Sequence, residues 1–126
     1  MQPQPVHTPN APQPVGPYSQ GMAAGNFIFI SGQIPLDPAS GAVTGAAIAD
    51  QARQALANLK AVLSSQSLGP DALVKTTVFL RSMADFAAFN VVYEEELNGA
   101  RPARSVVEVS ALPKNVLVEI EAIACR

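Results

Sequence analysis

The chain has 126 residues, of which 48% are hydrophobic and 14% charged, and its formal net charge is -2. This length suits one domain, and the apolar content suits a packed core and excludes a disordered chain. The negative charge and the scattered lysines and arginines argue against a nucleic-acid surface. No apolar run reaches the ~20 residues of a membrane-spanning helix, and no signal peptide is evident. We therefore expect no membrane association and a cytoplasmic location.

The cysteine and histidine content narrows the chemistry further. Cys125 is the only cysteine and His7 the only histidine. One cysteine excludes an intrachain disulfide, and one histidine argues against histidine triads, histidine metal sites and Cys-His pairs. Phosphate-loop, dinucleotide, zinc and nucleophile-elbow motifs are also missing from the sequence. Any chemistry must therefore use carboxylates, Arg, Tyr, Ser, backbone groups and water.

The first third of the chain predicts a leader, two strands and a loop. Residues 1–15 are proline-rich, which predicts an extended or mobile leader before a single domain at residues 16–126. Two short strands are predicted on either side of a turn at residues 24–26. The second strand contains residues 27–30, which are apolar on both faces, as in a strand covered from both sides. Residues 35–45 are turn-rich.

Two helices and one strand are predicted next. Apolar residues recur at helical spacing over residues 48–68, before a stop at residues 69–70. Residues 73–80 are rich in Val, Thr and Phe, which predicts a strand. Ser82 and Asp85 resemble a capping box that opens a second helix, ending at about Asn98. The first stripe consists of Ile48, Ala52, Leu56, Leu59 and Leu63, and the second of Phe86, Phe89, Asn90, Tyr93 and Leu97.

The last two strands are predicted at residues 103–110 and 116–124, joined as a hairpin. Glu119 and Glu121 share one face of the final strand, opposite its small apolar residues. Strands separated by long helices predict an α+β fold, with both helices on one face of a mixed sheet. The other face also carries apolar residues, and we expect a second copy of the chain to cover it. Residues 94–96, all glutamates, are most simply a solvated face.

Several residues are candidates for chemistry, each with a structural alternative. Arg104 can bind a planar carboxylate through two hydrogen bonds, or it is a surface charge. Glu119 can orient water as a base, or it protects the sheet edge or pairs with Arg104. Asn90 is an amide in an apolar stripe, which lines a site or caps a loop. Tyr18 and the Ser31-Gly32 pair lie where a ligand can approach the backbone, or they only pack.

The sequence resembles the RidA/YjgF family, the reactive-intermediate deaminase A group. The resemblance is carried by six blocks in consistent order, which span residues 16–124. The blocks are GPYSQ at 16–20, ISGQIP at 30–35, VKTTVFL at 74–80, MADF at 83–86, RPARS at 101–105 and VEIEAIA at 118–124.

This resemblance implies a chorismate-mutase-like α+β fold and a homotrimer whose sheets face inward, with active sites in clefts between subunits. The implied activity is hydrolysis of 2-iminobutanoate and 2-iminopropanoate to 2-oxo acids and ammonia, with no metal or organic cofactor.

The family's site residues map onto this sequence one by one. Arg104 matches the arginine that binds the substrate carboxylate, and Glu119 matches the glutamate that positions the attacking water. Val106 stands where many members have a cysteine whose contact runs through the backbone, so the contact can persist although thiol-dependent regulation cannot. The remaining matches to cleft residues are Tyr18, Ser31, Gly32 and Asn90.

Three other functions remain open at this point. A non-catalytic sensor of small carboxylates or 2-oxo acids would use the same cleft, although a pure carboxylate binder gains nothing from a nearby glutamate. An RNA-directed activity, described for some family members, conflicts with the net charge of -2. Chorismate mutase activity rests on the analogy of fold alone, and the cations that its dicarboxylate substrate needs are not evident.

Overall fold

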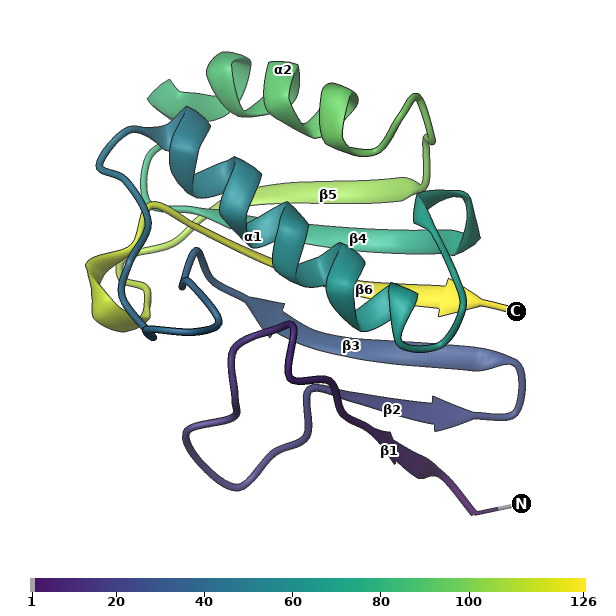
Figure 1. Ribbon diagram of the computed structural model, residues 1–126. Coiled ribbons are helices and arrows are strands. Elements are labelled where there is room, and N and C mark those ends of the chain that lie inside the picture. Colours follow the sequence, from purple (N-terminus) through teal and green to yellow (C-terminus); the bar gives the residue numbers. More distant parts are fainter. Residues whose placement is uncertain (1) are drawn as a thin grey trace.

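The computed structural model describes residues 2–126, in which two α-helices lie against one face of a six-stranded sheet (Figure 1). The helices are α1 (Ile48–Ser64) and α2 (Phe86–Glu96). Short 3-10 turns precede β4, α2 and β6, at Pro70–Ala72, Met83–Asp85 and Pro113–Asn115. The strands are β1 (Gln4–Val6), β2 (Gly21–Ala24), β3 (Phe27–Gln33), β4 (Leu73–Leu80), β5 (Ala103–Glu108) and β6 (Val118–Cys125).

The local patterns predicted both helices and every strand except β1, although most of the predicted ends differ by a few residues. β4 has the predicted bounds, and all five residues of the first predicted stripe are buried beneath α1. α1 ends at Ser64, before the expected Gly69, because Ser67 takes a left-handed φ of 60° and the chain turns there. The Ser82 hydroxyl accepts a hydrogen bond from the Ala84 amide and so begins the turn that leads into α2.

The strand order is β1-β2-β3-β6-β4-β5, and the predicted hairpin between the last two strands is wrong. β6 pairs with β3 and β4, both antiparallel, whereas β5 pairs with β4 in parallel at the sheet edge. A parallel pair needs a crossover, which α2 supplies. Burial explains the placement, because β6 buries every second side chain and β5 buries none. The strand richer in buried residues occupies the centre.

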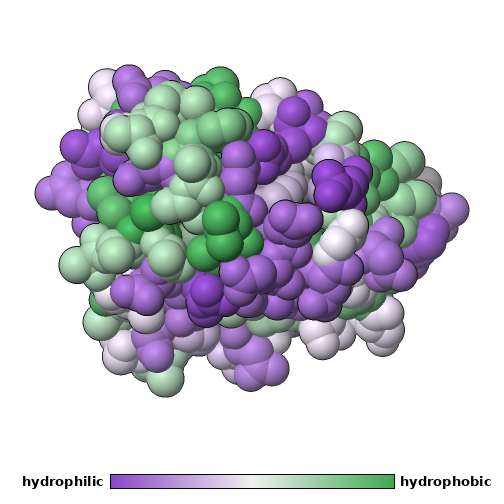
Figure 2. All heavy atoms as spheres, turned by 90° about the horizontal axis from the view of Figure 1, so that it is seen from above, coloured by the Kyte–Doolittle hydropathy of each residue, from purple (hydrophilic) through white to green (hydrophobic). Residues whose placement is uncertain are grey.

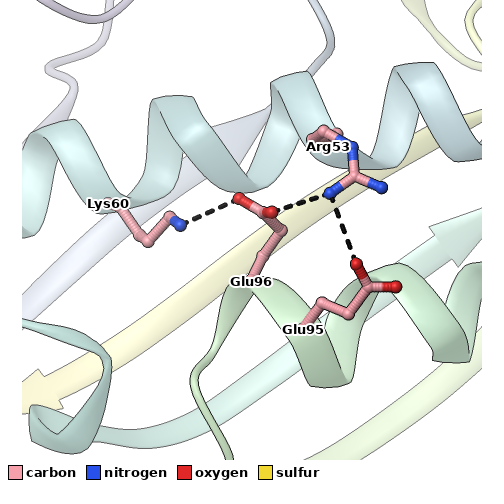
Figure 3. Close-up of polar contacts among 4 residues, drawn as sticks. All are labelled: Arg53, Lys60, Glu95 and Glu96. Carbon is pink, nitrogen blue, oxygen red and sulfur yellow. Dashed lines mark hydrogen bonds and ion pairs between the residues drawn. The ribbon is translucent and has the colours of Figure 1, made fainter.

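Both helices cover the same face of the sheet, as predicted (Figure 1). They are tied together by Glu96 of α2, whose carboxylate lies 2.8 Å from Arg53 and 2.9 Å from Lys60 of α1 (Figure 3). The hydrogen bond from Lys60 is the main cause that lowers the pKa of Glu96. The prediction that residues 94–96 form only a solvated face is therefore wrong for Glu96, which fixes α2 against α1.

The opposite face of the sheet is open in the single chain. Phe27 and Phe29 of β3 are 45% and 46% exposed, while Ile28 and Ile30 are buried against the helices. Val107 of β5 is 42% exposed on the same open face, opposite Phe79 of β4. Over α2, by contrast, hydrophobic and hydrophilic residues are interspersed (Figure 2). The apolar residues predicted on both faces of β3 are therefore covered on one side by the chain itself.

The described part of the proline-rich leader is fixed on the domain. β1 is extended, as predicted, and pairs with β2. The buried Gln20 side chain accepts a hydrogen bond from the Thr8 amide at 2.7 Å and donates to the carbonyls of Thr8 and Pro12 at 3.0 and 2.9 Å. Val6 and Ala11 are buried with the core. None of the helices within residues 2–126 is long and apolar enough to cross a membrane.

Candidate functional site

Arg104 lies near the start of the edge strand β5, beneath α2. Its Nη1 donates a hydrogen bond to Asn90 Oδ1 at 2.9 Å. The guanidinium carbon lies 4.8 Å from the centroid of the Tyr93 ring and 5.7 Å from that of Phe86, both on α2. Cation-π attraction is effective within about 6 Å of a ring centroid. Helix α2 therefore contacts the edge of the guanidinium through Asn90 and its face through Tyr93 and Phe86.

The guanidinium borders a cavity of about 380 Å³, lined by α2, by residues 99–102 and by Arg104. The ion pairs found within residues 2–126 all use Glu94, Glu95 or Glu96, so Arg104 has no carboxylate partner there. The neutral amide of Asn90 binds one nitrogen of Arg104, so the guanidinium keeps further N–H donors for a planar anion. The interpretation that Glu119 is the structural partner of Arg104 within one chain is therefore wrong.

Glu119 lies on β6 and packs against the backbone of Gly32 on β3. A Cβ atom added to Gly32 would lie 2.7 Å from Glu119 Oε2, so only glycine leaves room for the carboxylate there. The β3–β6 register shifts between Ile30 and Gln33, and Gly32 lies within this irregularity. Gly32 thus allows a close approach to its backbone, and the neighbour in the single chain is the carboxylate of Glu119. The approach of a ligand to the Ser31-Gly32 pair stays a prediction.

The Glu119 carboxyl is half-buried, and burial raises its pKa above that of an ordinary glutamate. The negative charge of Glu121, two residues along the same face, raises this pKa further. A carboxyl whose pKa is raised in this way is better suited to exchange protons near neutral pH. Glu119 borders a cavity of about 390 Å³ together with Tyr18, Gly32, Lys114 and the leader residues Pro12, Gln13 and Val15.

Ser31 and Val106 lie outside these two cavities. The Ser31 hydroxyl donates to the Ser19 carbonyl at 2.6 Å, and the residue lines a separate hollow of about 280 Å³ on the open face. Val106 pairs with Val78 of β4 and packs half-buried against the core. In the single chain the Val106 side chain therefore acts as a core residue.

The structure does not bring Arg104 and Glu119 together in one chain. Arg104 is aligned with Thr76 of β4, which is fully buried on the helix face. Glu119 is aligned with Phe79 of β4, which points to the open face because it lies three residues after Thr76. No residue lines both cavities.

Arg104 and Glu119 therefore belong to two separate groups of residues, which we name half-sites. The Arg104 half-site consists of Asn90, Tyr93 and Arg104, and the Glu119 half-site consists of Tyr18, Gly32 and Glu119.

Sequence reasoning missed the role of Tyr93, Phe86 and Lys114. Tyr93 and Phe86 belong to the stripe that was assigned to the core, yet both rings also face the guanidinium of Arg104. An available signal was the presence of two polar residues, Asn90 and Tyr93, three positions apart on one helix face. Lys114 lies in a turn with a left-handed φ of 55°, and no sequence pattern marked it.

Comparison with known proteins gives a consistent result. The family model described as "Endoribonuclease L-PSP" matches residues 8–126. A RutC family protein of Pyrococcus horikoshii is 53% identical, and the 2-iminobutanoate/2-iminopropanoate deaminase of Escherichia coli K12 is 51% identical; each match covers 96% of both chains. The crystal structure of the Escherichia coli YjgF gene product superimposes with a TM-score of 0.92 at 48% identity, covering 98% of both chains.

The structural match confirms the predicted chorismate-mutase-like α+β fold, and the sequence matches extend over nearly the whole chain. The chain therefore belongs to the RidA/YjgF family.

Proposed function

We propose that this protein hydrolyses reactive 2-imino acids to 2-oxo acids and ammonia, at a site formed by the Arg104 half-site of one copy and the Glu119 half-site of another. The observation that carries the proposal is the state of Arg104, which is held by Asn90 and Tyr93 and forms no ion pair with a carboxylate within residues 2–126 of its own chain. Relatives about half identical in sequence carry the name 2-iminobutanoate/2-iminopropanoate deaminase, which supports the same chemistry.

Arg104 supplies recognition of the substrate. A 2-imino acid carries a planar carboxylate next to an electrophilic C=N carbon, and the free edge of the guanidinium matches that carboxylate. Binding there fixes the position of the reacting carbon relative to the protein. The positive charge also draws electron density from the carboxylate and so favours attack at the neighbouring carbon.

Glu119 supplies proton transfer. Its carboxylate accepts a proton from water as the water oxygen bonds to the imine carbon, and the C=N bond becomes a C–N single bond. The proton then passes to the nitrogen, which gives a carbinolamine. Glu119 next takes the proton of the carbinolamine hydroxyl and passes it to the nitrogen, so that the C–N bond breaks, ammonia leaves, and the oxygen becomes the keto group of the 2-oxo acid. A carboxyl with a raised pKa is better matched to this exchange near neutral pH.

Assembly of the chain would bring the half-sites together. The open face exposes Phe27, Phe29 and Val107, which a neighbouring copy would bury. Arg104 lies on the edge strand at the border of this face, within reach of such a neighbour. We therefore propose a homotrimer with clefts between its subunits, as expected from the family resemblance.

A carboxylate sensor would need only the Arg104 half-site. It would gain nothing from a half-buried glutamate beside the ligand, since that charge opposes anion binding. The family description names an endoribonuclease, but the net charge of -2 does not provide the basic surface that binds a phosphate backbone.

The test couples a serine or threonine dehydratase to this protein and follows imine decay in the presence of semicarbazide. Wild type is expected to accelerate decay, and Arg104→Ala and Glu119→Ala are each expected to lose this acceleration. A wild type that binds 2-oxobutanoate without accelerating decay would favour the sensor. Salt-sensitive retention on RNA at physiological ionic strength would favour an RNA-directed activity instead.

A further inference from the structure

Tyr93 occupies a position between the core and Arg104. Its ring centroid lies 5.4 Å from that of the fully buried Phe89 and 4.8 Å from the guanidinium carbon of Arg104. Its hydroxyl forms a 2.6 Å hydrogen bond with the hydroxyl of Thr76 on β4. Tyr93 is 8% exposed and Thr76 is fully buried. Tyr93 therefore contacts both β4, through Thr76, and the guanidinium of Arg104.

The Thr76–Tyr93 hydrogen bond lies in a buried place that two apolar side chains could fill equally well. Val and Phe would replace Thr76 and Tyr93 with nearly the same volume and without polar groups to satisfy. A buried hydrogen bond is directional, so it fixes the tilt of the ring in a way that apolar packing alone does not. Burial raises the pKa of Tyr93, so its hydroxyl stays protonated near neutral pH and can donate to Thr76.

Two contacts then define the orientation of the guanidinium. The Asn90 amide oxygen binds one nitrogen and sets the rotation within the guanidinium plane. The Tyr93 ring lies against the guanidinium and sets the plane itself, with Phe86 further away at 5.7 Å. A long arginine side chain otherwise loses rotamer freedom when it binds a ligand, and fixing it beforehand reduces that cost.

We propose that Tyr93, anchored by Thr76, is the positioning residue that orients Arg104 for the substrate carboxylate. The inference rests on the proposed function of Arg104 and adds the cause of its fixed geometry. Tyr93 acts through Arg104 and does not itself touch the reacting atoms. Its loss should therefore weaken carboxylate binding and raise KM, with kcat changed little, because Arg104 keeps the charge that assists attack once the substrate is bound.

The experiment measures the Kd for 2-oxobutanoate by calorimetry, and KM and kcat for the imine, in wild type, Tyr93→Leu and Tyr93→Phe. Tyr93→Leu removes the aromatic face and is expected to raise Kd and KM about tenfold, the range of a desolvated cation-π contact. Tyr93→Phe keeps the aromatic ring but loses the hydrogen bond to Thr76, and is expected to raise Kd and KM about threefold. Thr76→Val removes the same anchor from the other side and should match Tyr93→Phe.

Val92→Ala is the matched control, because Val92 is a buried residue of the same helix, 3% exposed, that does not line the cavity beside Arg104. It should lower the melting temperature and leave Kd and KM unchanged. If Tyr93→Leu fails to fold, Thr76→Val and Tyr93→Phe carry the test, and wild-type Kd values in both would overturn the inference. A wild-type Kd and KM in folded Tyr93→Leu, or equal effects in Val92→Ala, would also overturn it.

These outcomes are separate from failure of the proposed function. A wild type that binds 2-oxobutanoate but does not accelerate imine decay would refute the deaminase, while the Kd series would still decide the role of Tyr93. Absence of 2-oxobutanoate binding in wild type would refute the carboxylate clamp, and with it both proposals.

Discussion

The contact between Glu119 and Gly32 shows how one missing Cβ atom positions a carboxylate. The side chain of Glu119 occupies space that any other residue at position 32 would fill. Gly32 does not adopt a left-handed φ, so alanine can take the same backbone conformation. The glycine therefore matters here for space and not for backbone freedom.

Gly32→Ala should consequently displace the carboxylate while the fold persists. We expect kcat to fall by about tenfold or more, because a displacement of about 1 Å at a reacting group is costly. The melting temperature should change little, since the flexible end of Glu119 can move away. Gly69→Ala is the matched control, because its new Cβ would meet only the end of the Asp71 side chain, at 3.3 Å. Unchanged kcat in Gly32→Ala would contradict the placement of Glu119.

Glu121 offers a way to shift the titration of Glu119 without touching it. Its charge raises the pKa of Glu119, so Glu121→Gln should lower that pKa. Activity that needs the Glu119 carboxylate rises with pH through this pKa, and the acidic limb of kcat/KM should therefore move to lower pH in Glu121→Gln. A pH series of kcat/KM checks this, and a limb that stays in place or moves to higher pH would disagree with Glu119 as the base.

At the scale of elements, α2 supplies the side chains that hold the guanidinium of Arg104. Asn90 and Tyr93 project from one of its faces, and Glu96 near its end binds Arg53 and Lys60 of α1 (Figure 3). The orientation of Arg104 therefore depends on how the two helices pack, although α1 contributes no residue to the half-site.

The N-terminal segment is a second element that the site uses. Gln20 holds it through hydrogen bonds to Thr8, Ala11 and Pro12, and Pro12 and Gln13 line the cavity beside Glu119. Proline signals alone predicted a leader, because the bonds of Gln20 join residues 8 to 12 positions apart in the chain and leave no local pattern. Pro12 and Gln13 thus form part of the wall of the cavity beside Glu119.

Gln20→Met should loosen the N-terminal segment that Gln20 binds. The substitution keeps the shape but removes the hydrogen-bond partner of the Thr8 amide and of the Pro12 carbonyl, which costs about 1–3 kcal/mol of stability for each group that stays buried. Hydrogen exchange measured by mass spectrometry should show loss of protection at residues 6–13, while α1 stays protected. Gln4→Met, at an exposed position of β1, serves as control. Full protection in Gln20→Met would show that other contacts hold the segment.

Periodicity predicted what is local and failed where pairing is distant. The apolar stripe of α1 and the alternation of buried and exposed side chains in β6 could be predicted, because each depends on residues a few positions apart. The position of β6 between β3 and β4 could not be predicted, because strand order depends on contacts between residues far apart in the chain. For the same reason the sequence could nominate Arg104 and Glu119 but not show that one chain holds them apart.

At the scale of the whole molecule, the separation of the half-sites and the open apolar face have one common explanation. Each chain carries the Arg104 half-site on the helix side of the sheet and the half-buried Glu119 on the open side. A single chain therefore cannot complete the proposed site. An assembly that buries Phe27, Phe29 and Val107 would complete one site at each contact between neighbours.

Complementation between two inactive variants tests this account most directly. Arg104→Ala and Glu119→Ala should each lack deaminase activity alone. When the two are unfolded and refolded together in equal amounts, some clefts receive Arg104 from one variant and Glu119 from the other. About a quarter of wild-type activity is expected, since each cleft in a closed ring draws its two halves independently. No recovery in verified mixed assemblies would contradict a site shared between subunits.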